Sequence, residues 1–312
     1  MDTSTGSAST ARRTRARWQP RRINWSEQIA AYAFLAPALA LFTLFAWWPI
    51  INSVLLSFQK VRLQGGSEWI GFRNFERMVA DPVFGIAWRN AFEFTMLSLL
   101  IGFFVPVLLA ILVQEMRVAK SFFRLAYFLP TVIPPLIATL VWKAIYEPEG
   151  GLLNSFLWTI GISSKADPIL WLQEAALVKP SMVVIMTWAG FGGTILIYLA
   201  ALQDLPVERY EAAEIDGASV WQRIRHITLP HLLPQMLVMM ILQVIGVMQV
   251  FLEPFVLTAG GPANRTVTPV LTIYRKAFLN GDFGLASAWS VMMIIVLAIF
   301  SAIYLRVSRT AD

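Results

Sequence analysis

Residues 94–113 read FTMLSLLIGFFVPVLLAILV, a run of twenty residues without Asp, Glu, Lys, Arg or His. A helix that crosses the hydrocarbon core of a bilayer needs about 20 mostly apolar residues. Inside the bilayer each backbone N–H and C=O group must also be bonded within the protein, which a helix achieves by itself. This run therefore predicts a transmembrane helix.

Further uncharged runs of similar length occur along the chain. Four contain no charged side chain, namely Ile29–Phe58, Ser181–Leu202, Leu232–Leu252 and Leu285–Leu305. One more run, Leu125–Trp142, contains Pro130, Pro134 and Pro135, which membrane helices tolerate where neighbouring groups satisfy the freed carbonyls. The sequence thus predicts an all-α polytopic membrane protein with six transmembrane helices. Their expected bounds are about 29–58, 90–114, 122–146, 180–202, 230–257 and 285–307.

The overall composition agrees with this fold class. Of the 312 residues, 57% are hydrophobic and only 14% are charged, whereas a soluble domain carries about 25% charged residues. The chain has no cysteine, which excludes disulfides and cysteine-based metal or redox sites. The net charge of +6 does not indicate a nucleic-acid partner, because the basic residues cluster at the ends of the apolar runs.

The first 23 residues differ in character from the transmembrane domain, residues 24–312. They are rich in Ser, Thr and Arg without apolar periodicity, which predicts a disordered basic tail. Its arginines favour a cytoplasmic N-terminus under the positive-inside rule, and six spans then place both termini of this multi-pass protein in the cytoplasm. These arginines are Arg12, Arg13, Arg15, Arg17, Arg21 and Arg22.

The longest polar connection, residues 147–178, follows the third predicted span. Within it, Pro168–Val178 is apolar on one side but too short to cross a bilayer. This pattern predicts an interfacial helix with Trp171 at the depth of the lipid headgroups.

A polar segment, Tyr210–Pro234, separates the fourth and fifth spans and reads YEAAEIDGASVWQRIRHITLPHLLP. Glu211-Ala212-Ala213 is followed after three residues by Gly217, and after nine more by Ile-x-Leu-Pro. This spacing resembles the EAA loop of ABC importer permeases, which docks on the ATP-hydrolysing subunit in the cytoplasm. The resemblance implies a coupling loop over residues 203–229. The residues that it assigns to ATPase coupling are Tyr210, Glu211, Ala212, Ala213, Asp216, Gly217 and Ala218.

The loop residues also predict its local structure. Pro206 suits the first position of a helix over Val207–Ile215, and Gly217 ends that helix by taking a positive φ. Ser219 can cap a second short helix, Val220–Ile227, so we expect an L-shaped pair at the membrane surface. The side chains offered to a partner would be Tyr210, Glu211 and Ile215.

Other stretches resemble the sugar-importing branch of the same family, and their order and spacing make the resemblance specific over residues 29–308. They include Gly71-Phe72-x-Asn74-Phe75, Trp188-Ala189-Gly190-Phe191, Leu202-Gln203-x-Leu205-Pro206, Gly260-Gly261-Pro262 and Gly284-Leu285-Ala286-Ser287-Ala288. The resemblance implies the fold of a type I ABC importer permease for residues 24–312, located in the cell inner membrane.

The resemblance further implies one subunit of a larger transporter. Such a permease pairs with a second homologous permease, two ABC ATPase subunits bind the two EAA loops, and an extracytoplasmic solute-binding protein delivers a sugar or oligosaccharide. This chain has no GxxxxGK[ST] phosphate-binding loop, so we expect no cofactor on it, with ATP and Mg²⁺ on the ATPase. No catalytic motif is present, which indicates a transport subunit rather than an enzyme.

Spans four and five, which flank the loop, offer candidates for the solute pathway. Trp188 with Gly190 and Gly193 sets an aromatic ring beside small residues, and Gln243 and Gln249 are uncharged polar groups within span five. Aromatic and amide groups suit a sugar. Glycines in membrane helices also permit close packing, and glutamines bond to neighbouring helices, so both interpretations stay open.

Two other functional classes stay open beside the ABC permease. One is a secondary transporter or channel that works without an ATPase. Its ion-coupled forms usually need ionisable groups at depth, and the spans hold almost none. The other is a membrane-embedded enzyme, which is disfavoured because the sequence shows no nucleophile, base or metal cluster.

Overall fold

The computed structural model describes residues 25–61, 66–116, 118 and 120–308. The predicted basic tail, residues 1–23, lies outside the described residues. The chain divides into two units, Met1–Ile51 and Asn52–Asp312. The first contains α1 (Trp25–Phe42), the π-helical turn η1 (Thr43–Trp47) and the start of α2 (Trp48–Ser57).

The predicted all-α membrane fold is confirmed. Among the described residues, five helical runs are long and apolar enough to cross a membrane, and a bent pair of helices makes a sixth. The runs are Gln28–Ser57, Val83–Glu115, Val178–Gln203, Val220–Met248 and Phe283–Arg306. The bent pair, Lys120–Val132 and Pro135–Ile145, turns by 101°. It breaks where Pro134 and Pro135 follow each other, because proline lacks the N–H that would continue the ladder.

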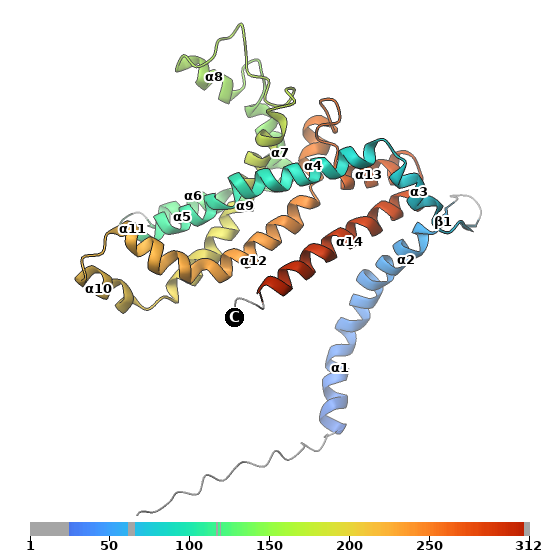
Figure 1. The fold of residues 1–312 in the computed structure, drawn as a ribbon, viewed down its shortest axis with the longest axis horizontal. Coiled ribbons are helices and arrows are strands. Elements are labelled where there is room, and N and C mark those ends of the chain that lie inside the picture. The colour runs from blue at the N-terminus through green and yellow to red at the C-terminus, as the bar shows by residue number, and fades with distance from the viewer. Residues whose placement is uncertain (1–24, 62–65, 117, 119, 309–312) are drawn as a thin grey trace, which may run out of the picture. The chain divides into compact units, whose positions relative to one another are not determined.

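The second unit builds its spans from several helices (Figure 1). They are α4 (Val83–Leu97), η2 (Ser98–Gly102), α5 (Phe104–Glu115), α6 (Lys120–Val132), α7 (Pro135–Ile145), α9 (Val178–Gln203), α12 (Leu229–Met248) and α14 (Phe283–Ser308). The shorter helices are α3 (Arg73–Val79), α8 (Leu152–Thr159), α10 (Val207–Ile215), α11 (Val220–Arg223), η3 (Ile224–Thr228), η4 (Pro254–Thr258), α13 (Pro269–Tyr274) and η5 (Arg275–Leu279). A small antiparallel ribbon pairs β1 (Gln59–Lys60) with β2 (Glu68–Trp69).

Helix α9 lies at the centre of the second unit, where it packs against α5, α6, α12 and η2. Tyr198 and Leu202 are buried in one hydrophobic cluster with Leu232 of α12. Gly192 permits the close approach of α6, because a Cβ there would lie 2.5 Å from the carbonyl oxygen of Tyr127. Figure 1 shows α12 between α4 and α14, and it packs against both.

The predicted interfacial helix over Pro168–Val178 is wrong, since turns occupy most of that range and a helix forms earlier, at α8. The buried Asn154 of α8 explains the difference. Its Nδ2 donates to the carbonyls of Pro148 and Ile169, at 3.2 and 3.0 Å, and its Oδ1 accepts from Trp171 Nε1 at 3.1 Å. These bonds compete with a helical ladder and turn Trp171 inward.

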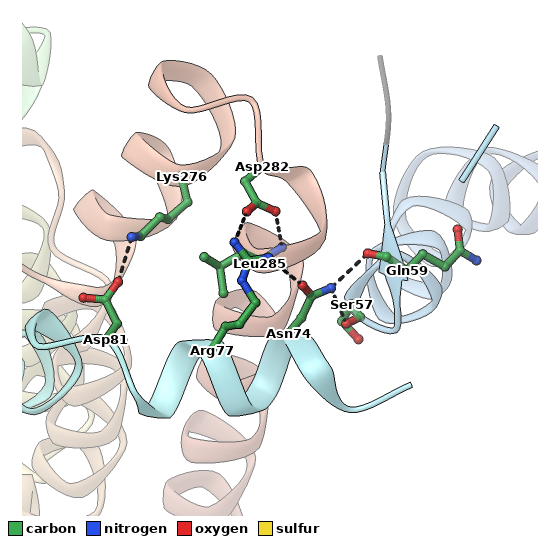
Figure 2. A network of polar contacts seen from close by, with 8 residues as sticks. All are labelled: Ser57, Gln59, Asn74, Arg77, Asp81, Lys276, Asp282 and Leu285. Carbon is green, nitrogen blue, oxygen red and sulfur yellow. Dashed lines mark hydrogen bonds and ion pairs between the residues drawn. The ribbon is translucent and has the colours of Figure 1, made fainter. Parts of the chain in front are cut away.

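A polar network joins α3 to the end of α2 and the start of α14 (Figure 2). Asn74 of α3, only 1% exposed, donates to the carbonyls of Ser57 and Gln59 at 3.0 and 2.9 Å. Arg77, one helical turn further on, pairs with Asp282 at 2.6 Å and also donates to Asn74. The network therefore connects segments about 200 residues apart through α3.

Gly284 lies inside this network, and its substitution tests the packing. A Cβ at Gly284 would lie 2.2 Å from the carbonyl oxygen of Gln59 and 2.8 Å from Asn74 Nδ2. We expect Gly284→Ala to destabilise the fold by about 1–3 kcal/mol, seen as a lower unfolding temperature in detergent. Gly85→Ala is the control, because no described atom would lie within 4 Å of its Cβ and alanine favours a helix. Equal losses in both variants would contradict this account.

Asp81 and Lys276 form an ion pair beside the network, with 2.7 Å between Oδ2 and Nζ (Figure 2). Burial alone would raise the pKa of Asp81, but hydrogen bonds from Lys276 and from the Val83 amide, with the lysine charge, hold it below its usual value. A lowered carboxyl pKa stabilises the fold above the unfolded pKa, and the contribution is lost as pH falls through the folded pKa. We expect the unfolding temperature to drop on acidification below about pH 4. The drop should be smaller in Asp81→Asn, and identical pH profiles would contradict the prediction.

Candidate functional site

The coupling segment, residues 203–229, begins with α10. Each residue of α10, all of which the structure describes, is exposed or half-exposed, and this includes Glu211, Ala212 and Ala213. The predicted helix bounds, Val207–Ile215, match those observed. Pro206 does not take the first helical position as predicted; it is the N-cap residue with an extended ψ of 128°.

Gly217 ends α10 with a φ of +74°, as predicted. The turn is closed by hydrogen bonds from the Gly217 amide to the Glu214 carbonyl and from the Ala218 amide to the Ala213 carbonyl, at 3.0 and 2.9 Å. Ser219 then caps α11 in a capping box with Gln222, in which each residue bonds the backbone of the other.

The predicted second short helix, Val220–Ile227, is not a separate element. It is the beginning of the fifth span, since the helical run continues from Val220 to Met248. Pro230 lies two residues after the π-helical turn η3, and this wider turn lets the helix pass the missing N–H without a break. Any movement of the turn at Gly217 therefore acts directly on the fifth span.

Two contacts fasten α10 to this continuous helix. The Tyr210 hydroxyl lies 2.8 Å from Thr228 Oγ1, and Thr228 is buried. Glu214 forms an ion pair with Arg223, whose side chain is mostly buried. The Tyr210 side chain is thus bonded within the chain and stays half-exposed, and Ile215 is 86% exposed. No signal in the sequence indicated that Thr228, Glu214 or Arg223 would hold α10 in place. The contacts of Thr228 with Tyr210 and of Arg223 with Glu214 form only because α10 folds back against the fifth span.

A groove of about 640 Å³ opens between α10 and the start of the fifth span. It is lined by Arg209, Ala212, Ala213, Asp216, His226, Ile227, Pro230 and His231. Its apolar lining comes from Ala212, Ala213, Ile227 and Pro230, and its other four residues are ionisable.

A cavity of about 360 Å³ lies between α9, α12 and the second span. Two predicted pathway residues, Gly190 and Gln243, line it. The remaining lining residues are Ser98, Gly102, Phe103, Pro106, Met186, Thr187, Phe191, Thr194, Tyr198, Met239, Leu242, Gly246 and Val247. A mostly apolar wall with few polar groups is typical of a small-molecule site.

The other three predicted pathway residues are not among those that line the cavity. Trp188 packs edge-on against Trp142, with 5.7 Å between ring centroids. Gln249 is exposed, and its amide donates to the Ile245 carbonyl of its own helix at 2.9 Å. Gly193 lies on α9 beside the lining residues Phe191 and Thr194 but does not line the cavity itself. The five residues predicted for the solute pathway therefore do not share one cavity.

Three polar residues of the cavity, Ser98, Thr187 and Gln243, lie together. Gln243 Nε2 donates to the carbonyl and hydroxyl oxygens of Ser98, at 2.8 and 2.7 Å. The hydroxyl of Thr187 is buried beside them and has no hydrogen-bond partner among the described residues. Gly102 brings the helices together here, since a Cβ would lie 2.7 Å from Thr187 Oγ1. The sequence did not mark Ser98 or Thr187, because hydroxyls are common in membrane helices.

A buried charge lies at the end of α9 away from α10. The Lys179 side chain is 5% exposed, pairs with Glu93 of α4 and donates to Asn90 Oδ1 at 2.8 Å. Asn90 Nδ2 in turn donates to the carbonyls of Asn264 and Val267, at 2.7 and 2.8 Å. One lysine thus links α4, α9 and the connection before α13, although the sequence showed almost no charge within the spans.

Comparisons with known proteins agree with this architecture. Residues 102–311 match the family described as "Binding-protein-dependent transport system inner membrane component". The chain is similar to the probable ABC transporter permease YurN of Bacillus subtilis, with 33% identity over 91% of this chain and 97% of the relative. It shares 33% identity with the arabinooligosaccharides transport system permease AraP of the same organism, over 92% of this chain and 91% of the relative.

A solved structure has the same fold. It is the bacterial alginate ABC transporter in complex with an alginate pentasaccharide-bound periplasmic protein, and the match covers 92% of this chain and 96% of that chain. The TM-score is 0.81 at 25% identity. The family match covers every lining residue of the cavity except Ser98, together with residues 203–229 and the last span, and the two relatives each match more than 90% of the chain. This chain therefore belongs to the inner membrane components of binding-protein-dependent transport systems, the permeases of ABC importers.

Proposed function

We propose that this chain is the permease subunit of an ABC importer for a sugar or oligosaccharide. It forms the translocation pathway with a second homologous permease, and an extracytoplasmic solute-binding protein delivers the solute. ATPase subunits, which hold ATP and Mg²⁺, dock on the coupling segment. The coupling segment and both termini therefore face the cytoplasm. The observation that carries the proposal is the exposed α10, fastened to the same continuous helix that lines the cavity.

The contacts of α10 suggest how an ATPase would act on the pathway. Displacement of α10 would pull on Thr228 through Tyr210 and on Arg223 through Glu214. The same helix reaches Gln243 fifteen residues after Thr228, a distance of about 22 Å along its axis. A rigid helix transmits such a displacement, so the cavity would change shape when the ATPases close.

The character of the cavity supports a neutral, polyhydroxylated solute. Its wall is mostly apolar, and its polar residues are all uncharged, namely Gln243, Ser98, Thr187, Thr194 and Tyr198. Apolar surface suits the faces of a sugar ring, and amides and hydroxyls suit its edge. The names of the relatives point the same way, since AraP is named for arabinooligosaccharides.

Substitution of the two glutamines of the fifth span tests the cavity. Gln243→Leu removes the donor that faces Ser98 and Thr187, and we expect the efficiency of ATP-driven uptake to fall about tenfold, equivalent to about 1.4 kcal/mol. Gln249→Leu is the matched control, because that amide bonds only its own helix. Uptake of radiolabelled solute into vesicles measures both. An equal loss in the two variants would remove Gln243 from the pathway.

The proposal as a whole is tested by purification and reconstitution. The tagged chain should copurify with a second permease and an ATPase, and vesicles that contain this complex should take up sugar only with ATP and the loaded binding protein. A secondary transporter or channel would continue to transport without the ATPase. Uptake that persists in vesicles containing this chain alone would overturn the proposal in favour of that alternative.

A further inference from the structure

We propose that the chain holds a second sugar site, at the end of the bundle opposite the coupling segment. The site is a cavity of about 290 Å³ between α7, the connection from α7 to α9, and η4 with the turn that follows it. The inference rests on the proposed function, under which this end faces the solute-binding protein. The cavity would receive one ring of a neutral sugar before it passes inward.

The lining residues come from three separate segments of the chain. They are Lys143, Tyr146, Glu147, Pro148, Leu172, Gln173, Leu257, Thr258, Gly261 and Pro262. A cavity of this volume has room for roughly ten water molecules, which is enough to hold a single sugar ring.

One wall of the cavity is held rigidly by buried aromatic residues. Tyr146 is 3% exposed, stacks on Trp171 with 5.8 Å between centroids, and donates its hydroxyl to the Ser181 carbonyl at 3.1 Å. Burial raises the pKa of Tyr146 to about 12, so the hydroxyl stays protonated as a donor. Asn154 fixes the neighbouring connection through the carbonyls of Pro148 and Ile169.

The opposite wall is held by hydroxyl bonds. Thr258 Oγ1 lies 2.7 Å from Thr266 Oγ1, and Thr266 donates to the Gly261 carbonyl at 2.8 Å. The Gly261 amide closes the turn by donating to the Thr258 carbonyl at 3.0 Å. Both walls are therefore formed before a ligand arrives, which reduces the ordering cost of binding.

The chemistry of the lining selects the class of ligand. The floor is apolar, with Leu172 and Leu257 each 8% exposed, and the rim carries the exposed side chains of Lys143, Glu147 and Gln173. A cation, an anion and an amide around an apolar floor offer donors and acceptors to hydroxyl groups. Glu147 would repel an anionic ligand, and Lys143 would repel a cationic one. A lipid chain would leave the polar rim without hydrogen-bond partners. A neutral sugar therefore fits best.

This outer cavity shares a buried wall with the central cavity, the one of about 360 Å³ that Gln243 lines. Tyr146, Leu172 and Leu257 line the outer cavity, Val247 lines the central cavity, and all four belong to one buried hydrophobic cluster. This cluster therefore borders both cavities, and a sugar held in the outer cavity would lie against it.

The absence of cysteine from the chain makes a direct test possible. Gln173→Cys and Glu147→Cys each place a single thiol on the rim, and Glu174→Cys is the control, because that neighbour is exposed but does not line the cavity. The whole transporter, purified without binding protein, is labelled with a maleimide in the presence of maltose, lactose or arabinobiose. Glycine betaine serves as the osmotic control.

We expect at least one of these sugars to slow labelling at both rim positions and not at Glu174→Cys. At a sugar concentration of about three times the dissociation constant, the labelling rate should fall about fourfold, because only the free site reacts.

Unchanged labelling rates with all three sugars, or equal slowing at the control position, would overturn the second site. In a separate reaction unliganded binding protein is added back, and protection by that protein but by none of the sugars would overturn the second site in favour of a protein-docking pocket. If the wild-type complex takes up sugar with ATP while protection fails, only this inference fails; if it takes up none, the proposed function fails.

Discussion

Gly217→Val should abolish ATP-driven uptake while the chain still inserts into the membrane. At Gly217 the backbone has a φ of +74°, a region that β-branched residues avoid because Cβ meets the carbonyl oxygen. A Cβ there would meet no described atom within 4 Å, so the backbone conformation alone carries the effect. To relieve the strain, the turn must open and lose the bonds of the Gly217 and Ala218 amides to the end of α10. This would move α10 away from its place beside Thr228.

The matched control is Gly217→Asn, which is close to valine in size but tolerates the left-handed region. It should keep most of the uptake, whereas the valine variant should fall to background and lose its ATPase on purification. Uptake, copurified ATPase and the amount of chain in the membrane are measured together. Normal uptake by the valine variant, or loss of both variants alike, would contradict a conformational role for Gly217.

Lys179→Met should be the most destabilising of the substitutions proposed for this protein. The change keeps the length of the side chain but leaves Glu93 without its buried partner and Asn90 Oδ1 without a donor. Removing one member of a buried ion pair costs about 3–5 kcal/mol. We expect the lower end, about 3 kcal/mol, because the Glu93 side chain is 39% exposed and water can solvate part of its charge. A lower unfolding temperature of the purified chain in detergent reports this loss.

A double-mutant cycle separates the ion pair from general packing. Glu93→Gln alone should also destabilise the fold, because it leaves Lys179 buried with a weaker partner. In the double variant neither charge remains, so the combined loss should be smaller than the sum of the two single losses. Additive losses would show that the two side chains act independently, which would contradict the pairing in the structure.

The features predicted well from the sequence depend on residues close together in the chain. The bounds of α10 and the positive φ of Gly217 follow from local backbone preferences, and the capping role of Ser219 depends on a partner three residues away. The spans follow from runs of uncharged residues whose length matches the bilayer. In each case the physical cause lies within one helical turn or one continuous run.

One error arose where distant partners decide the conformation, since Pro168–Val178 has a helical pattern, yet Asn154 and Tyr146 hold it in turns. The other has a local cause. The sequence predicts a separate helix over Val220–Ile227, but the π-helical turn before Pro230 joins this segment to the fifth span.

The sequence by itself determined that this chain is a helical membrane protein with a polar segment between its fourth and fifth spans. Only the tertiary structure decided which polar residues meet. It brought Gln243 to Ser98 and Thr187, turned Gln249 and Trp188 elsewhere, and paired Lys179 with Glu93 across 86 residues. The physical reason is that apolar length and backbone preference are properties of a segment, whereas a buried polar group is stabilised only by the partner that packing places beside it.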